Sequence, residues 1–320
     1  MTRQEEALSA IAGWNVTPVG PLEEIKEDRL FRIRTLDGQD LVLKSLEAGD
    51  NLNTPERLTL QHEILAHLAT EGVGVSKPIR HPTGKTWTEY EGRLYVLSPW
   101  LDASGSMGGT DPTQLIPNWG RAVAELHLAL SVLPVVDFES RTWRNKPMVE
   151  IFDQCLPTLA RLSPKLDLRD RLPTRSELEG DMRNALENLP EQLIHRDCHP
   201  ENLVRNGNEV VGFVDCDHFS IGSPAHDVGY FLIRMVQWYF DVTTDEWLGG
   251  MGSFLTAYHS RRRLSQAECK ALPHMMVYVL VMSAERYAKL GSAAEVIKEL
   301  DAVDFVRSNV DRIQALISID

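Results

Sequence analysis

Between positions 195 and 215 the chain carries an aspartate, an asparagine and a second aspartate at a spacing that suits phosphoryl transfer. His195, Asp197 and Asn202 form an H-x-D-x-x-x-x-N pattern, and Asp215 follows thirteen residues later. A carboxylate that accepts the proton of an alcohol makes that alcohol a nucleophile, and Mg²⁺ prefers hard oxygen ligands that link it to nucleotide phosphates. Asp197 suits the first task, and Asn202 with Asp215 suits the second.

The elements around this pattern must hold the three side chains in place. Asn206-Gly207 is typical of a tight reversal between two strands, so the sequence predicts a hairpin between Asn202 and Asp215. The apolar pair Phe213-Val214 predicts that Asp215 ends the second strand of this hairpin.

This segment resembles the aminoglycoside phosphotransferase family, a branch of the protein-kinase-like fold that also contains choline, homoserine and fructosamine kinases. Members typically show H-x-D-x-H-P-x-N, then an apolar strand ending I-D-(F/W)-(D/E), then a further Asp. In this chain the three motifs are residues 195–202, residues 213–217 and Asp227. A fourth motif, the helix G-x-x-(L/V)-A-x-L-H, matches residues 120–127 and makes His127 a buried hydrogen-bonding histidine.

The resemblance implies a role for each residue of the loop. Asp197 would orient or deprotonate the substrate hydroxyl, while Asn202 and Asp215 would hold Mg²⁺ against ATP. Asp227 would brace the loop. Together with a lysine on the preceding lobe, these oxygens would converge on one magnesium-bound triphosphate.

That lysine is Lys44, on the second strand of a predicted antiparallel hairpin. Residues 29–34 and 40–46 alternate apolar and polar side chains across Asp37-Gly38. Val42 and Leu46 share a face with Lys44, so its ammonium lies on a partly apolar surface where it needs an anion such as an ATP phosphate.

A helix is predicted after Pro55, and Glu63 lies on it. The resemblance pairs Glu63 with Lys44, an ion pair that would hold the lysine against the α- and β-phosphates. The alternative is that Glu63 is one solvated charge among several, since Glu56 lies on the same helix.

The predicted strand 94–97 leads into Ser98-Pro99-Trp100, and the small-residue run 103–109 that follows indicates a linker. By position in a kinase-like fold, Ser98 and Trp100 would lie at the adenine edge; Pro99 has no amide hydrogen to donate. Trp100 could instead simply close the core between lobes. Residues 20–26 hold a single Gly rather than a glycine repeat, so no phosphate-covering loop is assigned.

The expected fold is therefore α+β and two-lobed, of the protein-kinase-like type. A small N-terminal lobe with an antiparallel sheet, residues 1–101, would end in the hinge. A larger, mainly helical C-terminal lobe, residues 102–320, would carry the catalytic loop and the acceptor site. Apolar stripes predict core helices in this lobe at residues 151–162, 228–238 and 272–282.

Composition limits the partners. The 320 residues are 43% hydrophobic and 25% charged, which is ordinary for a globular enzyme, and the net charge of −13 argues against nucleic acid or an anionic membrane. The N-terminus shows no secretory signal, and four cysteines without a CxxC pair fit free thiols, so the cytoplasm is expected. The oligomeric state stays open.

The expected function is transfer of the γ-phosphoryl group of ATP to a hydroxyl of a small molecule. The negative charge favours a cationic or neutral acceptor, but antibiotic, sugar, amino-alcohol and amino-acid acceptors all remain open, as does GTP in place of ATP. Residues 215–227 are too few for the activation segment of a protein kinase. Two alternatives remain: a pseudokinase that binds nucleotide without turnover, and a Zn²⁺ site formed by the Cys and His residues at 198, 199, 216 and 218.

Overall fold

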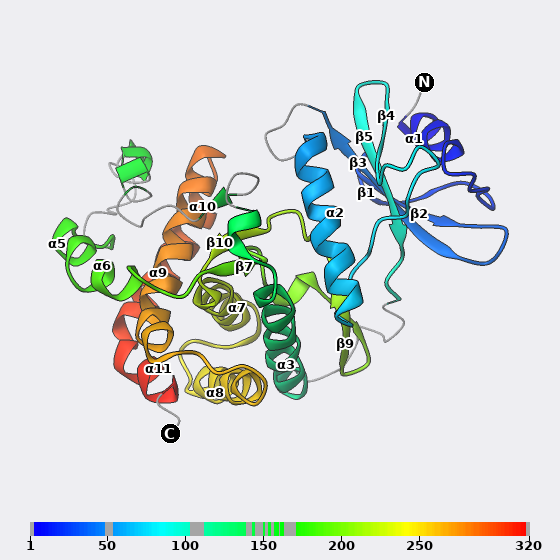
Figure 1. The fold of residues 1–320 in the computed structure, drawn as a ribbon. Helices are drawn as coiled ribbons and strands as arrows, with labels where there is room; N and C mark the ends of the chain where they lie inside the picture. Colours follow the sequence, from blue (N-terminus) through cyan, green and yellow to red (C-terminus); the bar gives the residue numbers. More distant parts are fainter. Residues whose placement is uncertain are drawn as a thin grey trace. The chain divides into compact units, whose positions relative to one another are not determined.

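The computed structural model describes residues 3–48, 54–102, 112–138, 143–144, 150, 153–154, 157–159, 161–162 and 171–317. The predicted linker at 103–109, Cys155 and part of the predicted helix 151–162 lie outside these ranges. The chain forms two compact units (Figure 1): the first is Met1–Ser106 with Leu203–His218, and the second is Met107–Asn202 with Phe219–Asp320.

The first unit is built on an antiparallel sheet of five strands in the order β1-β2-β3-β5-β4. The strands are β1 (Glu23–Lys26), β2 (Leu30–Arg34), β3 (Asp40–Glu47), β4 (Thr88–Tyr90) and β5 (Arg93–Pro99). The predicted hairpin is confirmed, because Arg34 of β2 pairs with Asp40 of β3. Gly38 in the turn has a φ of +83°, a left-handed conformation that glycine adopts without a steric penalty.

The two helices of this unit pack on clusters from opposite faces of the sheet. Leu41 and Leu43 of β3 belong to the core cluster that includes α1 (Arg3–Ala12), whereas Leu46 packs on the cluster that includes Leu58 of α2 (Pro55–Thr70). Since side chains alternate along a strand, Lys44 lies on the same face as Leu46. Thr54 caps α2 by accepting a hydrogen bond from the Arg57 amide.

A second, two-stranded sheet completes the first unit. Strands β8 (Leu203–Asn206) and β9 (Glu209–Phe213) form the predicted hairpin, and Asn206 pairs with Glu209 across the Gly207-Asn208 turn. Gly74 holds β9 in place: its carbonyl accepts the Phe213 amide at 2.8 Å. A Cβ on Gly74 would lie 1.9 Å from the Val211 oxygen, so only glycine fits this approach.

The second unit is mostly helical. Its helices are α3 (Pro112–Ser131), α5 (Arg175–Glu179), α6 (Asp181–Leu186), α7 (Pro224–Tyr239), α8 (Glu246–His259), α9 (Gln266–Lys289), α10 (Ala293–Ser308) and α11 (Val310–Ile317), with short 3₁₀ helices η1 (Val135–Asp137) and η2 (Pro200–Asn202). Its strands β6 (Trp143–Arg144), β7 (Gln192–Ile194) and β10 (Ser220–Gly222) form a sheet in the order β6-β10-β7.

Aromatic side chains fill the centre of the second unit, where α3 packs on α8 and α7 packs on α9 (Figure 1). Trp119, Phe231, Phe254 and Tyr258 are among its largest fully buried side chains, and the rings of Phe231 and Phe254 stack at 4.8 Å. The predicted helices at 120–127, 228–238 and 272–282 lie within α3, α7 and α9 and are confirmed.

An antiparallel-sheet unit and a mostly helical unit confirm the expected α+β class. The predicted domain boundary after residue 101 stays a prediction; the first compact unit also takes in residues 203–218 from far along the chain. Within the described ranges, no helix combines the length and apolar character that a membrane crossing requires.

Candidate functional site

In the second unit, the loop 195–202 brings Asp197 and Asn202 together. The Asn202 side-chain amide donates to the Asp197 backbone oxygen at 2.8 Å and lies 3.4 Å from the Asp197 carboxylate. His199 Nε2 lies 3.8 Å from the same carboxylate. The Asp197 side chain keeps 30% of its surface exposed, so a substrate hydroxyl can approach it.

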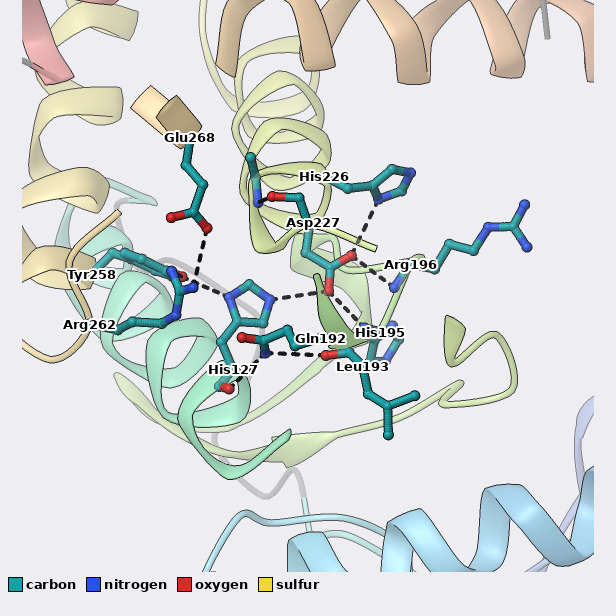
Figure 2. A network of polar contacts seen from close by, with 12 residues as sticks. His127, Gln192, Leu193, His195, Arg196, His226, Asp227, Tyr258, Arg262 and Glu268 are labelled. Atoms are coloured by element: carbon teal, nitrogen blue, oxygen red, sulfur yellow. Dashed lines mark hydrogen bonds and ion pairs between the residues drawn. The ribbon is translucent and has the colours of Figure 1, made fainter. Parts of the chain in front are cut away.

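Asp227, in the first turn of α7, holds the backbone of this loop (Figure 2). Its Oδ2 accepts the His195 amide and its Oδ1 accepts the Arg196 amide, each at 2.8 Å. Arg196 has a φ of +70°, a left-handed conformation that non-glycine residues rarely adopt. The two bonds stabilise this backbone directly before Asp197, which confirms the expected bracing role of Asp227.

Asp227 is an anion although it is fully buried. Burial raises the pKa of its carboxyl, but hydrogen bonds from His127 and His226 outweigh burial and hold the pKa well below its usual range. His127 Nε2 lies 3.2 Å from Asp227 Oδ2, and His127 Nδ1 lies 2.8 Å from the Tyr258 hydroxyl. The His127 side chain is 0% exposed, which confirms the prediction of a buried hydrogen-bonding histidine.

In the first unit, Lys44 lies against two carboxylates. Its Nζ is 3.2 Å from Asp215 Oδ1 and forms a second ion pair with Asp217 Oδ2. Burial lowers the pKa of Lys44, but Asp217 and Asp215 more than offset it and raise the pKa to about 12. In turn, Lys44 outweighs burial and lowers the pKa of Asp215. The Lys44 ammonium and the Asp215 carboxylate are thus charged at neutral pH.

A turn, not a strand, brings Asp215 and Asp217 to one side. We expected Asp215 to end the second strand of the hairpin, but β9 ends two residues earlier at Phe213, Asp215 has a φ of +55°, and residues 216–217 form a turn. An aspartate in this left-handed region costs of the order of 1 kcal/mol or more, and such conformations cluster at functional sites.

Two residues of α2, which the sequence reasoning did not select, complete the surroundings of Asp217. Gln61 Nε2 donates to the Asp217 backbone oxygen at 2.6 Å. His62 is buried, and burial, opposed by the Asp217 charge, lowers the pKa of its imidazole to about 4. In the sequence, Gln61 could have been recognised as a polar residue within the apolar stripe that Leu58 and Leu65 define.

The other three residues predicted to bind the cofactor also lie in the first unit. Glu63 lies on α2 with an exposed side chain, and its ion pair with Lys44 stays a prediction. Ser98 is buried near the end of β5, and the Trp100 amide donates to the Asp40 oxygen at 2.9 Å. That amide is therefore already used, while the Trp100 ring lies under the Arg32 guanidinium at 4.7 Å.

Each predicted metal ligand, considered by itself, offers oxygen atoms that suit a hard cation rather than zinc. The Asn202 amide nitrogen is anchored on Asp197, which leaves its carbonyl oxygen as the atom able to ligate a metal, and Asp215 offers carboxylate oxygens. Cys216 is buried, and burial raises the pKa of its thiol, which disfavours the thiolate that zinc needs. Within the ranges that the structure describes, no three His, Cys, Asp or Glu residues are grouped to hold a metal.

The site and the fold agree with a comparison to known families. Residues 21–269 match the family model of the phosphotransferase enzyme family, APH. This match spans well over half of the chain, and the chain belongs to that family, as the loop motif indicated.

Relatives with similar sequences include homoserine kinases. A homoserine kinase of Nitrobacter winogradskyi is 29% identical over 222 residues, which are 66% of this chain and 61% of that relative. One of Methylobacillus glycogenes is 24% identical and covered over 63% of its length, so the chain spans less than two thirds of these relatives.

Among solved structures, an amicoumacin kinase in complex with AMP-PNP, Ca²⁺ and Ami aligns with a TM-score of 0.67 at 17% identity, covering 94% of both chains. An aminoglycoside phosphotransferase from Alicyclobacillus acidocaldarius aligns with a TM-score of 0.68 at 13% identity, covering 97% of this chain and 94% of that one. At these identities the likeness concerns the fold.

Proposed function

We propose that this protein is a kinase that transfers the γ-phosphoryl group of ATP to a hydroxyl of a small molecule. The observation that carries the proposal is the loop 195–202, where Asp197 and Asn202 lie in hydrogen-bonding contact on a backbone held by a buried anion, in a chain of the phosphotransferase enzyme family.

Each predicted residue has a role in this reaction. Asp197 accepts the proton of the acceptor hydroxyl, and Lys44 binds phosphate oxygens. Asn202 and Asp215 hold Mg²⁺, which neutralises charge on the phosphates when it is bound. Glu63 is proposed to support Lys44, and Ser98 and Trp100 to flank the adenine.

The ion pairs of Lys44 suggest how metal and nucleotide depend on each other. In the protein alone, Asp215 and Asp217 satisfy the ammonium. A triphosphate that binds Lys44 brings more negative charge to these carboxylates, and a divalent cation compensates for it. We therefore expect nucleotide to bind far more weakly without Mg²⁺ than with it.

For the acceptor, we propose an alcohol that also carries an amine. The net charge of −13 favours cationic over anionic acceptors. The relatives named homoserine kinase and the neighbour named aminoglycoside phosphotransferase point to acceptors of this kind. We place the reaction in the cytoplasm, where ATP is available.

The test is a panel of hydroxylated amines, namely homoserine, choline, amino sugars and aminoglycosides, scored by ADP release with MgATP. Asp197→Asn should lower kcat by about 100-fold or more while nucleotide affinity stays within about twofold, because a general base contributes about 10²–10⁴-fold. The matched control is Glu201→Gln, which removes the same charge at an exposed position of the same loop and should leave kcat unchanged.

Equal turnover by the wild type and Asp197→Asn would overturn the assignment of the base. If the wild type binds MgATP but releases no ADP with any acceptor of the panel, a nucleotide-binding module without turnover becomes the better description.

A further inference from the structure

Three polar residues extend the buried network behind the loop and have no role in the proposed chemistry. Tyr258 lies near the end of α8, Arg262 follows that helix, and Glu268 lies in the first turn of α9 (Figure 2). Tyr258 is 0% exposed and Glu268 is 2% exposed, and the Arg262 side chain is 15% exposed. Groups this polar are retained in an interior when their hydrogen bonds are satisfied.

The contacts form one continuous chain. Glu268 Oε1 lies 3.2 Å from Arg262 Nη2, and Arg262 Nη1 lies 3.0 Å from the Tyr258 hydroxyl. That hydroxyl lies 2.8 Å from His127 Nδ1, and His127 Nε2 lies 3.2 Å from Asp227 Oδ2. Asp227 then accepts the backbone amides of the loop.

The number of available protons fixes which atom donates at each contact of this hydrogen-bonded series. A guanidinium can only donate, so Arg262 donates to the Tyr258 oxygen. The single proton of that hydroxyl is then available to His127 Nδ1, which must accept it. A neutral imidazole carries one N–H, so the proton of His127 is on Nε2 and points to Asp227. The Asp227 anion requires a donor at this position, so both ends of the chain demand the same arrangement.

We propose that Tyr258 and Arg262 are positioning residues for the loop that carries Asp197. Arg262 donates to the Tyr258 oxygen and Tyr258 donates to His127, which keeps the His127 ring as a neutral Nε2–H donor to Asp227. Asp227 in turn accepts the His195 and Arg196 amides. This inference rests on the proposed function for its effect on catalysis, but its hydrogen-bond pattern can be tested without turnover.

The effect reaches the loop because Asp227 has no solvent to compensate a lost partner. If Tyr258 no longer donates, Nδ1 of His127 is left as a buried acceptor, and the ring is free to rotate or to take up a second proton beside Asp227. Either change alters the position of the carboxylate. The left-handed backbone of Arg196 depends on that carboxylate, and Asp197 is the next residue.

The first measurement is ¹⁵N NMR of the ten histidines in the full chain, with His127 assigned from a His127→Asn variant. We expect His127 to be neutral at pH 7, with its proton on Nε2. A proton on Nδ1, or a doubly protonated ring, would overturn the proposal.

The second measurement compares Tyr258→Phe with the wild type by amide hydrogen exchange. Loss of one buried hydrogen bond should speed exchange of the His195 and Arg196 amides about fivefold. It should also lower kcat about tenfold, with both KM values within about twofold, because the loop is misplaced while substrates still bind. Unchanged exchange of these amides in Tyr258→Phe would refute a positioning role.

Two further variants separate this role from general destabilisation. Arg262→Lys keeps a donor-only cation and should retain most of the protection, whereas Arg262→Met should not. The neighbouring Arg261→Met is the matched control, because Arg261 forms an exposed ion pair with Glu125 outside the chain of contacts. If Arg261→Met and Arg262→Met alter exchange equally, the proposal fails. A wild type without turnover, by contrast, would defeat the proposed function and leave the exchange and NMR results to decide this inference.

Discussion

Gly74→Ala is the sharpest perturbation of the structure around Asp215. The added Cβ would lie 1.9 Å from the Val211 oxygen, 2.8 Å from the Val211 carbonyl carbon and 2.9 Å from the Gly212 Cα. All three atoms belong to the backbone of β9, so no flexible side chain can move aside. Because such contacts are essentially never shorter than 3.0 Å, the strand must retreat by more than about 1 Å.

The cost follows from what this retreat breaks. The 2.8 Å hydrogen bond from the Phe213 amide to the Gly74 oxygen is lost, at about 0.5–1.5 kcal/mol, and overpacking costs about 1–3 kcal/mol more. A total of about 3 kcal/mol lowers the unfolding temperature of the first unit by about 10 °C. Asp215 follows Phe213 by two residues, so affinity for Mg²⁺-nucleotide should fall as well.

The assay is thermal unfolding followed by circular dichroism, together with titration calorimetry of MgATP. Gly249→Ala is the control, since a Cβ at Gly249 in α8 meets nothing within 4 Å and alanine favours a helix. The control should unfold at or slightly above the wild-type temperature. If Gly74→Ala unfolds and binds MgATP as the wild type does, the close approach of Gly74 and β9 does not position Asp215.

Three further outcomes test the electrostatics. Burial lowers the pKa of His62 to about 4, so the folded state resists protonation of this imidazole. The contribution of neutral His62 to the free energy of unfolding is complete above pH 6.5 and falls by up to about 3 kcal/mol as the pH drops to 4. Urea titrations should find this loss in the wild type and not in His62→Asn. Glu299→Ala leaves the buried Arg234 without its carboxylate and should cost about 3–5 kcal/mol in urea unfolding, whereas the apolar pair Glu299→Leu with Arg234→Met should cost clearly less. Asp217→Asn removes the larger of the two attractions that raise the pKa of Lys44, so acetylation of Lys44 at pH 9 should be about tenfold faster than in the wild type; an unchanged rate would contradict the ion pair.

Local patterns predicted the elements of this fold well. The alternation on β3 placed Lys44 on the same face as Leu46, and the Asn-Gly signal placed the β8–β9 turn. These signals work because the period of a strand and the geometry of a tight turn are properties of a few consecutive residues.

Pairings between distant residues were harder to predict. Lys44 and Asp215 are 171 positions apart, and only the family resemblance brought them together, because no local pattern in either segment indicates the other. The turn at 216–217 was missed because an alternating apolar run reads as a strand until tertiary contacts stop it. The hydrogen bonds that link Glu268, Arg262 and Tyr258 to His127 were missed because they join distant residues. His127 lies on a helix 131 positions before Tyr258.

The composition of the first compact unit has a consequence for protein synthesis. Its last segment, Leu203–His218, is synthesised only after residues 107–202, which belong to the helical unit. When residues 1–106 have emerged from the ribosome, all five strands of the sheet are present. Strand β9, which covers Gly74, and the two acids that pair with Lys44 have not yet been synthesised. The first unit can therefore complete its fold only after about two thirds of the 320 residues have been synthesised. A nascent chain or a fragment truncated near residue 102 exposes the Lys44 ammonium without its two acids and the Gly74 backbone without β9.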